Sequence, residues 1–446
     1  MKKPNISVIG IGYAGLCTAI GFASKGYHVI ASDNDTEKVA KINNGIPPFH
    51  EPGLQNLLNQ SIQSGHFKCV INQTETAIAE TDLTFVAVGT TSKPDGSIDL
   101  KFTESVAHDI GKALNRKEKY HIVIIKSTVV PGATQDLVKP ILEQESAKKC
   151  GSDFGLCMNP EFLRQGSAFE DTLHADRLVI GEYDKKSGDT LENLYKGFYG
   201  ANIPPIIRTS LSTAELIKYA SNSFLATKTS FMNMIANMCE KIPGADVKVV
   251  ATAMGLDKRI GPLFLNAGLG YGGSCFPKDL KALMAHSKNL GYRLNLLEAV
   301  ESVDKTQPLK AIKFCKDLFG NLKGKRVAIL GLAFKPDTDD MREAPAIPII
   351  KHLIKKGANV TAYDPAAMPI AKTVFKNKIQ YAISVIDCLK NADCCILVTE
   401  WDEFKKLKPE DFTKNMKQAV LIDGRRIYDP AEFSRKMKFT AIGLGH

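Results

Sequence analysis

Short apolar runs alternate with helical patterns along most of the chain. The first run covers residues 6–9, a helical apolar stretch extends to about Ser24, and a second run covers residues 27–32. Further runs at residues 83–88 and 122–125 continue the alternation. Strands that alternate with helices are typical of βαβ units. The first part of the chain is therefore predicted to form a doubly wound, Rossmann-like domain with a parallel sheet.

The same alternation starts again at Lys323. Apolar runs at residues 326–331, 359–363, 394–398 and 420–423 predict strands, and residues 346–356 predict a helix. The first of these strands ends at Gly331, but the turn after it lacks the second and third glycines of the first domain. We therefore expect a second Rossmann-like domain that does not bind a second dinucleotide.

A long helix is predicted between the two domains, at residues 208–242. Ser212 and Glu215 have the spacing of a capping box, and apolar residues at three- and four-residue steps form one stripe: Leu216, Ala220, Phe224, Phe231, Ile235 and Met238. Lys218 and Asn222 lie one turn apart, either in one polar pocket or on a solvated helix face. The fold class is α/β, with domains at 1–205 (dinucleotide-binding), 206–305 (helical middle domain with the long helix) and 306–446.

Composition narrows the classes of protein to which the chain can belong. The 446 residues are 44% hydrophobic and 24% charged, which is ordinary for globular domains. Ten cysteines show no C-x-x-C spacing, so we expect no metal site and a reducing cytoplasm. No run reaches the ~20 apolar residues of a membrane span. The net charge of +10 favours anionic small molecules or reflects dispersed surface lysines, and no basic-aromatic cluster suggests nucleic acid.

A glycine-rich turn follows the first predicted strand. Gly10, Gly12 and Gly15 match the G-x-G-x-x-G pattern that brings a pyrophosphate to a helix N-terminus. Asp33 ends the second strand, 23 positions after Gly10, where a carboxylate can hold the ribose hydroxyls of NAD. Lys38 leaves NADP open, and a βα turn without a ligand is the alternative for the glycines. Ser127 and Thr128 follow another strand, where they line the cofactor cleft or serve as turn residues.

Cys275 is the most distinctive candidate for chemistry. It lies between Gly270, Gly272 and Gly273 on one side and a Lys278-Asp279 pair on the other. Flexible glycines and nearby charge suit a reactive thiolate, whereas a lone cysteine is more often a buried structural residue. The surrounding chain decides between the two interpretations.

Several separated motifs resemble the UDP-glucose 6-dehydrogenases in identity and order. They are the Gly10 turn, Lys126-Ser127-Thr128, the Asn159-Pro160-Glu161-Phe162-Leu163-Arg164 segment, the helix from Glu215 to Asn222, residues 270–279 and Gly331-Leu332-Ala333-Phe334-Lys335. The resemblance covers nearly the whole chain. It implies that a sugar primary alcohol is oxidised to a carboxylate by two NAD⁺, through a thiohemiacetal and then a thioester on Cys275.

The resemblance also implies roles for individual residues. Lys218 and Asn222 stabilise the oxyanion of the adducts, Asp279 positions water, and Thr128 and Glu161 hold a proton-accepting water network. The residues expected to bind NAD are Gly10, Gly12, Tyr13, Ala14, Gly15, Asp33, Lys38, Val88, Gly89, Thr90, Thr91, Ser127, Thr128, Gln165, Lys278 and Arg342. Those expected to bind the substrate are Glu161, Phe162, Leu163, Arg164, Lys218, Asn222, Arg259, Asn266, Gly270, Tyr271, Gly272, Phe334, Lys335 and Arg425.

Two positions depart from the family pattern. Gln165 stands where many members have a glutamate, and Asn266 replaces a lysine of the animal enzymes. The first retains only hydrogen bonding, and the second removes one phosphate contact. Arg259 resembles an arginine that reaches into the site of a neighbouring subunit, so a homodimer is expected.

The predicted substrate is UDP-glucose, and three alternatives remain. A related dehydrogenase would act on GDP-mannose or a UDP-N-acetylhexosamine by the same chemistry. A nucleotide-sugar sensor would bind NAD without oxidation, but it has no need of the Cys275, Lys218, Asn222 and Asp279 set. A two-electron dehydrogenase would not need Cys275 and would yield one NADH per turnover.

Overall fold

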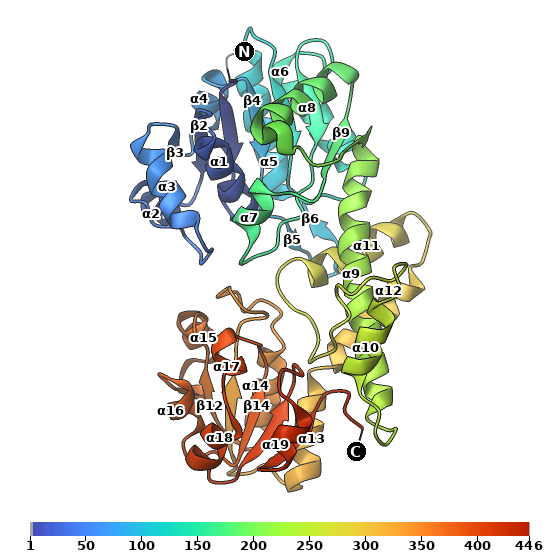
Figure 1. Ribbon diagram of the computed structural model, residues 1–446. Helices are drawn as coiled ribbons and strands as arrows, with labels where there is room; N and C mark the ends of the chain where they lie inside the picture. Colours follow the sequence, from blue (N-terminus) through green and yellow to red (C-terminus); the bar gives the residue numbers. More distant parts are fainter. Residues whose placement is uncertain (1–2, 446) are drawn as a thin grey trace. The chain divides into compact units, whose positions relative to one another are not determined.

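The computed structural model describes residues 3–445, which divide into two compact units. Of the described residues, the first unit contains 3–221 and 281–286, and the second contains 222–280 and 287–445. Helix α9 (Leu211–Cys239) is continuous and contributes residues to both units (Figure 1). Each unit is built around its own sheet.

The first unit has an eight-stranded sheet in the order β10-β9-β8-β7-β4-β1-β2-β3. The strands are β1 (Ile6–Ile9), β2 (Val29–Asp33), β3 (Phe67–Ile71), β4 (Leu83–Val86), β7 (Ile122–Ile125), β8 (Gly155–Met158), β9 (Leu178–Glu182) and β10 (Ile206–Ser210). Neighbouring strands are parallel apart from β8 and β9, which run antiparallel. A separate hairpin pairs β5 (Thr91–Ser92) with β6 (Ile98–Asp99). The order reverses beside β1, which is the switch point where such sheets bind ligands.

Helices cover both faces of this sheet (Figure 1). They are α1 (Tyr13–Ser24), α2 (Thr36–Asn43), α3 (Leu54–Gln63), α4 (Thr74–Ala79), α5 (Lys101–Asn115), α6 (Lys139–Ser146), α7 (Ala168–Leu173) and α8 (Lys185–Tyr199). In β7, Ile122 and Ile124 belong to one hydrophobic cluster, while Val123 and Ile125 belong to another. Successive side chains of a strand point to opposite faces, so the continuous apolar run reflects a sheet that is buried on both sides.

The second unit has a six-stranded parallel sheet in the order β13-β12-β11-β14-β15-β16. Its strands are β11 (Arg326–Leu330), β12 (Asn359–Tyr363), β13 (Gln380–Tyr381), β14 (Cys394–Leu397), β15 (Val420–Asp423) and β16 (Lys438–Ala441). Its helices are α10 (Val247–Gly255), α12 (Asn295–Thr306), α13 (Leu309–Phe319), α14 (Ala346–Lys355), α15 (Met368–Phe375), α16 (Val385–Leu389), α17 (Asp402–Lys405), α18 (Pro409–Asn415) and α19 (Pro430–Ser434). Helix α11 (Phe276–Asn289), like α9, contributes residues to both units. The predicted fold class, with two Rossmann-like parallel sheets and a long central helix, is confirmed.

Helix α9 differs from the sequence prediction in two details. Residues 206–210 form strand β10, so the helix begins at Leu211 rather than near Arg208. The proposed capping box is wrong, because the N–H of Thr213 donates to the Oγ of Ser210 at 3.3 Å. Glu215 is fully buried and instead accepts from the backbone N–H groups of Gly132 and Thr134, at 2.6 and 2.8 Å. Burial raises the pKa of Glu215 to about 7.

The apolar stripe of α9 is the face that the chain leaves exposed. Leu216, Phe224, Phe231 and Met238 are 45%, 65%, 43% and 60% exposed. The polar residues at positions 218 and 222 are buried instead. The solvated-face alternative for Lys218 and Asn222 is therefore excluded.

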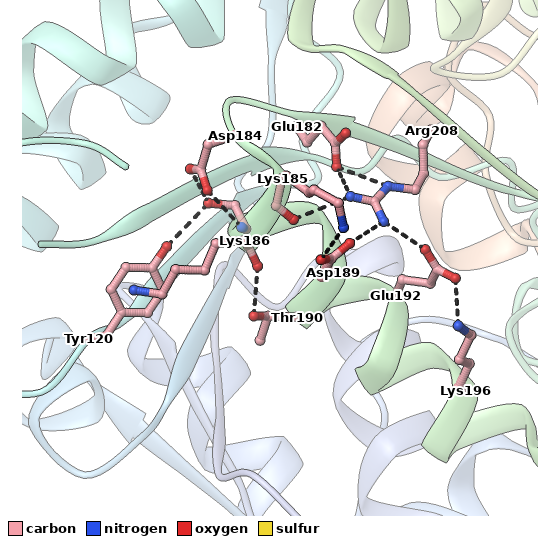
Figure 2. A network of polar contacts seen from close by, with 11 residues as sticks. Tyr120, Glu182, Asp184, Lys185, Lys186, Asp189, Thr190, Glu192, Lys196 and Arg208 are labelled. Atoms are coloured by element: carbon pink, nitrogen blue, oxygen red, sulfur yellow. Dashed lines mark hydrogen bonds and ion pairs between the residues drawn. The ribbon is translucent and has the colours of Figure 1, made fainter. Parts of the chain in front are cut away.

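An ion-pair network fastens β10 to β9 and α8 at the edge of the first sheet (Figure 2). Arg208 donates to Glu182, to Asp189 at 2.5 Å and to Glu192 at 2.9 Å. Lys196 extends the network by pairing with Glu192 at 2.7 Å. Three carboxylates around one guanidinium hold the edge strand that leads directly into α9. Among the described residues, no helix is both long and apolar enough to cross a membrane.

Candidate active site

In the glycine-rich turn after β1, a side chain would meet different surroundings at each of the three glycines. Gly10 has a φ of +88°, and a Cβ there would lie 2.8 Å from the backbone N of Val88. A Cβ on Gly15 would lie 1.9 Å from the carbonyl O of Gly10. A Cβ on Gly12 would meet no atom within 4 Å, so the space beside this residue is open. The turn leads into α1 with room for a ligand at the helix N-terminus.

Asp33 lies at the end of β2 and faces this turn. Its Oδ2 accepts from the N–H of Ile11 at 2.8 Å, and the Nζ of Lys38 is 3.2 Å from its Oδ1. Lys38 is therefore paired with the carboxylate. This arrangement favours NAD over NADP, because a 2′-phosphate would compete with Asp33 for the same cation. Tyr13, at the start of α1, donates to the carbonyl O of His50 at 2.9 Å.

Hydroxyl groups after β4 and β7 tie the neighbouring strand ends together. Ser127 Oγ donates to the carbonyl O of Val88 at 2.7 Å, and Thr90 Oγ1 donates to the carbonyl O of Thr128 at 3.1 Å. Gln165 Oε1 is buried and accepts no hydrogen bond from the described part of the chain. A buried acceptor without a protein donor and an open glycine turn fit a bound dinucleotide.

Glu161, Lys218 and Lys126 form a charged cluster in the first unit. Lys218 Nζ donates to Glu161 Oε1 at 2.9 Å, and Glu161 Oε2 accepts from the N–H of Leu163 at 2.6 Å. Burial would raise the pKa of Glu161, but Lys218, the N–H of Leu163 and Lys126 together lower it. Burial lowers the pKa of Lys126 to about 8, and Lys218 acts in the same direction against the attraction of Glu161. The cluster therefore holds two cations against one ionised carboxylate.

Cys275 immediately precedes α11 in the second unit. Its carbonyl O accepts from the N–H of Asp279 at 2.8 Å, which is the first backbone bond of that helix. The thiol therefore lies at a helix N-terminus, where the helix field stabilises a thiolate. The Oγ of Ser274 lies 3.7 Å from its Sγ. All ten cysteines are described, none forms a disulfide, and nine are buried while Cys275 is partly exposed.

Asn222 and Lys278 converge on Asp279 in the same unit. Asn222 Nδ2 donates to Asp279 Oδ2, and Lys278 Nζ donates to Asp279 Oδ1, both at 2.6 Å. Asp279 is 1% exposed, so both oxygens of a buried carboxylate are held by donors. Burial of this charge is tolerated because of these two donors.

The glycines before Cys275 bring the backbone against other segments of the second unit. A Cβ on Gly272 or Gly273 would lie 2.9 Å from Phe334 Cβ and 2.8 Å from its ring, respectively. The N–H of Gly273 donates to the carbonyl O of Arg342 at 2.8 Å. Arg425 Nη1 donates to the carbonyl O of Gly270 at 3.1 Å. Three other predicted ligand-binding segments, those of Phe334, Arg342 and Arg425, thus contact this loop.

Three of the remaining predicted basic residues pair with nearby acids. Arg164 donates to Asp171 with a shortest distance of 2.5 Å, and Arg259 donates to Asp257 at 2.6 Å. Arg342 pairs with Asp340 at 2.6 Å. Lys335 lies with its Nζ 6.0 Å from the Phe334 ring centroid. Asn266, Thr91 and Gly89 are exposed, while Ala14 is partly exposed.

Three charged residues beside these groups were not predicted from the sequence. Lys126 is buried within the Lys126-Ser127-Thr128 motif, and its position directly after four apolar strand residues was the signal in the sequence. Glu51 accepts from the N–H groups of Gly166 and Phe169, at 2.8 and 3.3 Å, and so holds the segment that follows Glu161. Asp304, on α12, accepts from Tyr271. Neither acid lies in a motif that spacing alone would single out.

Comparison with protein families gives three matches along the chain. Residues 4–199 match the NAD binding domain of the UDP-glucose/GDP-mannose dehydrogenase family. Residues 212–306 match its central domain, and residues 328–430 match its UDP binding domain. The matches follow one another in the order of the two Rossmann-like sheets and the helical segment between them.

Individual relatives match over nearly their full length. The UDP-glucose 6-dehydrogenase AglM of Haloferax volcanii is 43% identical over 95% of this chain and 96% of its own. TuaD of Bacillus subtilis, another UDP-glucose 6-dehydrogenase, is 41% identical over 97% and 91%. Among solved structures, a UDP-glucose dehydrogenase from Pyrobaculum islandicum superposes with a TM-score of 0.91 at 37% identity, over 99% of this chain and 98% of its own.

Proposed function

The chain belongs to the UDP-glucose/GDP-mannose dehydrogenase family, and on this basis we propose that it oxidises UDP-glucose to UDP-glucuronate with NAD⁺. The identity of the substrate is supported by 41–43% sequence identity to relatives named UDP-glucose 6-dehydrogenases. A UDP-D-ManNAc dehydrogenase from Pyrococcus horikoshii is 27% identical. UDP-glucose is therefore favoured over an N-acetylated sugar.

The proposed cofactor site combines the Gly10–Gly15 turn, Asp33 and Gln165. Bound NAD⁺ supplies the hydride acceptor for two successive oxidations. Gly12 leaves room for the pyrophosphate, and Asp33 holds the ribose hydroxyls. Further proposed contacts come from Tyr13, Ala14, Lys38, Val88, Gly89, Thr90, Thr91, Ser127, Thr128, Lys278 and Arg342.

Cys275 is the proposed nucleophile. Its thiolate adds to the C6 aldehyde, and the resulting thiohemiacetal is oxidised to a thioester that water hydrolyses to the carboxylate and the free thiol. Lys218 and Asn222 are proposed to stabilise the oxyanions. Removing either side chain should reduce the rate about 10²-fold to 10³-fold. Asp279 would position the hydrolytic water, with Thr128 and Glu161 in the proton-accepting network.

The proposed substrate contacts lie in three segments. Phe162, Leu163 and Arg164 would surround the sugar, residues 266–272 would enclose the diphosphate, and Phe334, Lys335 and Arg425 would hold the uridine. The close approach of Gly272 and Gly273 to Phe334 supports this assignment, because it joins the second and third segments. We further propose domains at 1–205, 206–305 and 306–446, with UDP-sugar binding in the last.

The exposed stripe of α9 supports the proposed homodimer. Leu216, Phe224, Phe231 and Met238 form a row of large apolar side chains, which marks an interaction surface rather than a solvated one. A second copy of the chain would cover this row, and Arg259, whose side chain is 89% exposed, would reach the neighbouring site. The proposed location is the cytoplasm, which matches ten reduced cysteines.

The proposed reaction is tested by counting NADH per sugar consumed. The protein is given UDP-glucose, UDP-N-acetylmannosamine and GDP-mannose in separate reactions. Two NADH with UDP-glucose alone supports the proposal, whereas activity confined to another sugar or to none contradicts it. Cys275→Ala should bind NAD⁺ and form no uronate, and Cys150→Ala, which changes a buried cysteine, should still give two NADH. Unchanged turnover of Cys275→Ala would refute the thioester mechanism.

A further inference from the structure

The loop that leads to Cys275 is held by side chains from separate elements of the second unit. The N–H of Gly268 donates to Asn233 Oδ1 on α9, and its carbonyl O accepts from Gln307 Nε2, both at 2.8 Å. The backbone of Gly273 is bound at the other end of the loop by Arg342. Between these two points, residues 269–272 have no regular secondary structure that would fix their backbone.

The peptide group between Gly270 and Tyr271 is held from both sides by opposite charges. The N–H of Tyr271 donates to Asp304 Oδ1 at 2.8 Å, and the carbonyl O of Gly270 accepts from Arg425 Nη1 at 3.1 Å. Gly270 has a φ of +97°, and a Cβ there would lie 2.9 Å from Asp304 Oδ1. The carboxylate is therefore packed directly against this backbone.

We propose that Asp304 is a positioning residue that fixes the Gly270–Tyr271 peptide, and with it the loop that carries Cys275 and encloses the sugar diphosphate. The inference rests on the proposed function for the identity of the ligand. The hydrogen bond of Asp304 goes to the backbone N–H of Tyr271 rather than to a side chain, so it acts through the backbone of the loop. A loop fixed before the ligand arrives loses less entropy on binding.

The ionisation of Asp304 changes the strength of its hydrogen bond with the Tyr271 N–H. Burial raises the pKa of Asp304 to about 7; the N–H of Tyr271 and the Arg425 guanidinium oppose this shift, while Glu343 and Glu301 reinforce it. These groups come from the loop (Tyr271), from α12 (Glu301), from the segment before α14 (Glu343) and from the segment after β15 (Arg425). A hydrogen bond to a carboxylate is stronger than one to a neutral carboxyl group. The loop is therefore held more firmly above neutral pH than below it.

Hydrogen exchange of the Tyr271 amide directly measures how strongly Asp304 protects this N–H, and it requires no enzyme turnover. Asp304→Asn keeps an acceptor at Oδ1 but cannot ionise, whereas Asp304→Ala removes the acceptor. At pH 8 we expect exchange about fivefold faster in the Asn variant than in the unaltered protein, and less than twofold faster at pH 6. The Ala variant should exchange about tenfold faster at both pH values. Asp317→Asn, on the exposed side of α13, is the matched control and should change nothing.

Kinetics separate positioning from a general loss of stability. The KM for UDP-glucose of Asp304→Asn should rise about fivefold at pH 8 and be nearly unchanged at pH 6, with kcat within twofold at both. An Ala variant that leaves Tyr271 exchange unchanged overturns the proposed hold. An Asn variant whose exchange ratio is the same at pH 6 and pH 8 overturns the dependence on ionisation. If the protein oxidises no sugar, exchange still decides the inference while the proposed function fails on its own.

Discussion

Replacing Lys126 by methionine is expected to stabilise the protein at neutral pH. Lys126 is buried, and its pKa falls from 10.5 to about 8. At about 1.4 kcal/mol per tenfold change in the equilibrium, this fall corresponds to about 3 kcal/mol lost by the charged form on folding. Relaxation and water penetration reduce the effect, so we expect a gain of about 1–2 kcal/mol. Asn159 Oδ1, which accepts from Lys126 Nζ at 3.0 Å, keeps its bond from Tyr195 at 2.5 Å.

The sign of the pH dependence follows from the direction of the shift. The folded pKa lies below the unfolded one, so the unfolded chain binds more protons between about pH 8 and 10.5. Stability of the unaltered protein should therefore gain a contribution from Lys126 as the pH rises through this window. Lys126→Met should lack that contribution, and its advantage should shrink from pH 7 to pH 9.5.

Urea denaturation at pH 7 and pH 9.5 measures both effects, with Lys119→Met as the matched control for an exposed lysine. A loss of more than about 1 kcal/mol at pH 7, or an advantage that does not shrink with pH, would refute the reasoning. Activity provides a second measurement. Glu161 loses one of the cations that lower its pKa, so the acid limb of kcat/KM should move to higher pH.

Three further changes test the fold and the site. Gly15→Ala should lower the free energy of unfolding by about 3 kcal/mol, because its Cβ would overlap the carbonyl O of Gly10. Gly12→Ala should keep its melting temperature and bind NAD⁺ at least tenfold more weakly, and equal effects of the two substitutions would contradict the assigned steric roles. Arg208→Met should lower the free energy of unfolding by about 1 kcal/mol at low salt and by less at 1 M salt, whereas the control Lys196→Met should change it little. A loss that does not depend on salt would indicate packing rather than charge. If the proposed homodimer forms through this face, Phe231→Asp should yield monomers in analytical ultracentrifugation, and an unchanged sedimentation coefficient would exclude this face from the proposed dimer.

Local sequence signals predicted the sheets and the glycine turn because each depends on neighbours in the chain. Apolar runs report strands buried on both faces, and the three glycines of the turn report steric limits set within a few residues. Helix α9 shows where local signals fail. Ser212 and Glu215 have capping-box spacing, but Glu215 binds backbone 81 and 83 residues away. Spacing carries no information about such a partner.

The sequence left open which face of α9 is buried, for a related reason. Periodicity identifies an apolar stripe but not what covers it, and here the polar side is buried because Lys218 and Asn222 find charged partners. Asp304 was missed because its importance arises from contact with Tyr271, 33 residues earlier in the chain. Residues that act through the backbone of another segment leave no motif in their own.

The charge of the first-unit cluster supports an oxyanion role better than the identity of any one residue does. Lys126 and Lys218 both lie near the ionised carboxylate of Glu161, but Lys126 donates to the amide oxygen of Asn159, so its charge is buried without a carboxylate bonded to it. Such a charge is costly in the resting protein, since water is excluded and one cation has no carboxylate of its own. The cost is offset when negative charge develops on a bound adduct, and an interaction that strengthens only then accelerates the reaction. The proposed oxyanion role therefore predicts that Lys126→Met lowers kcat more than it raises KM.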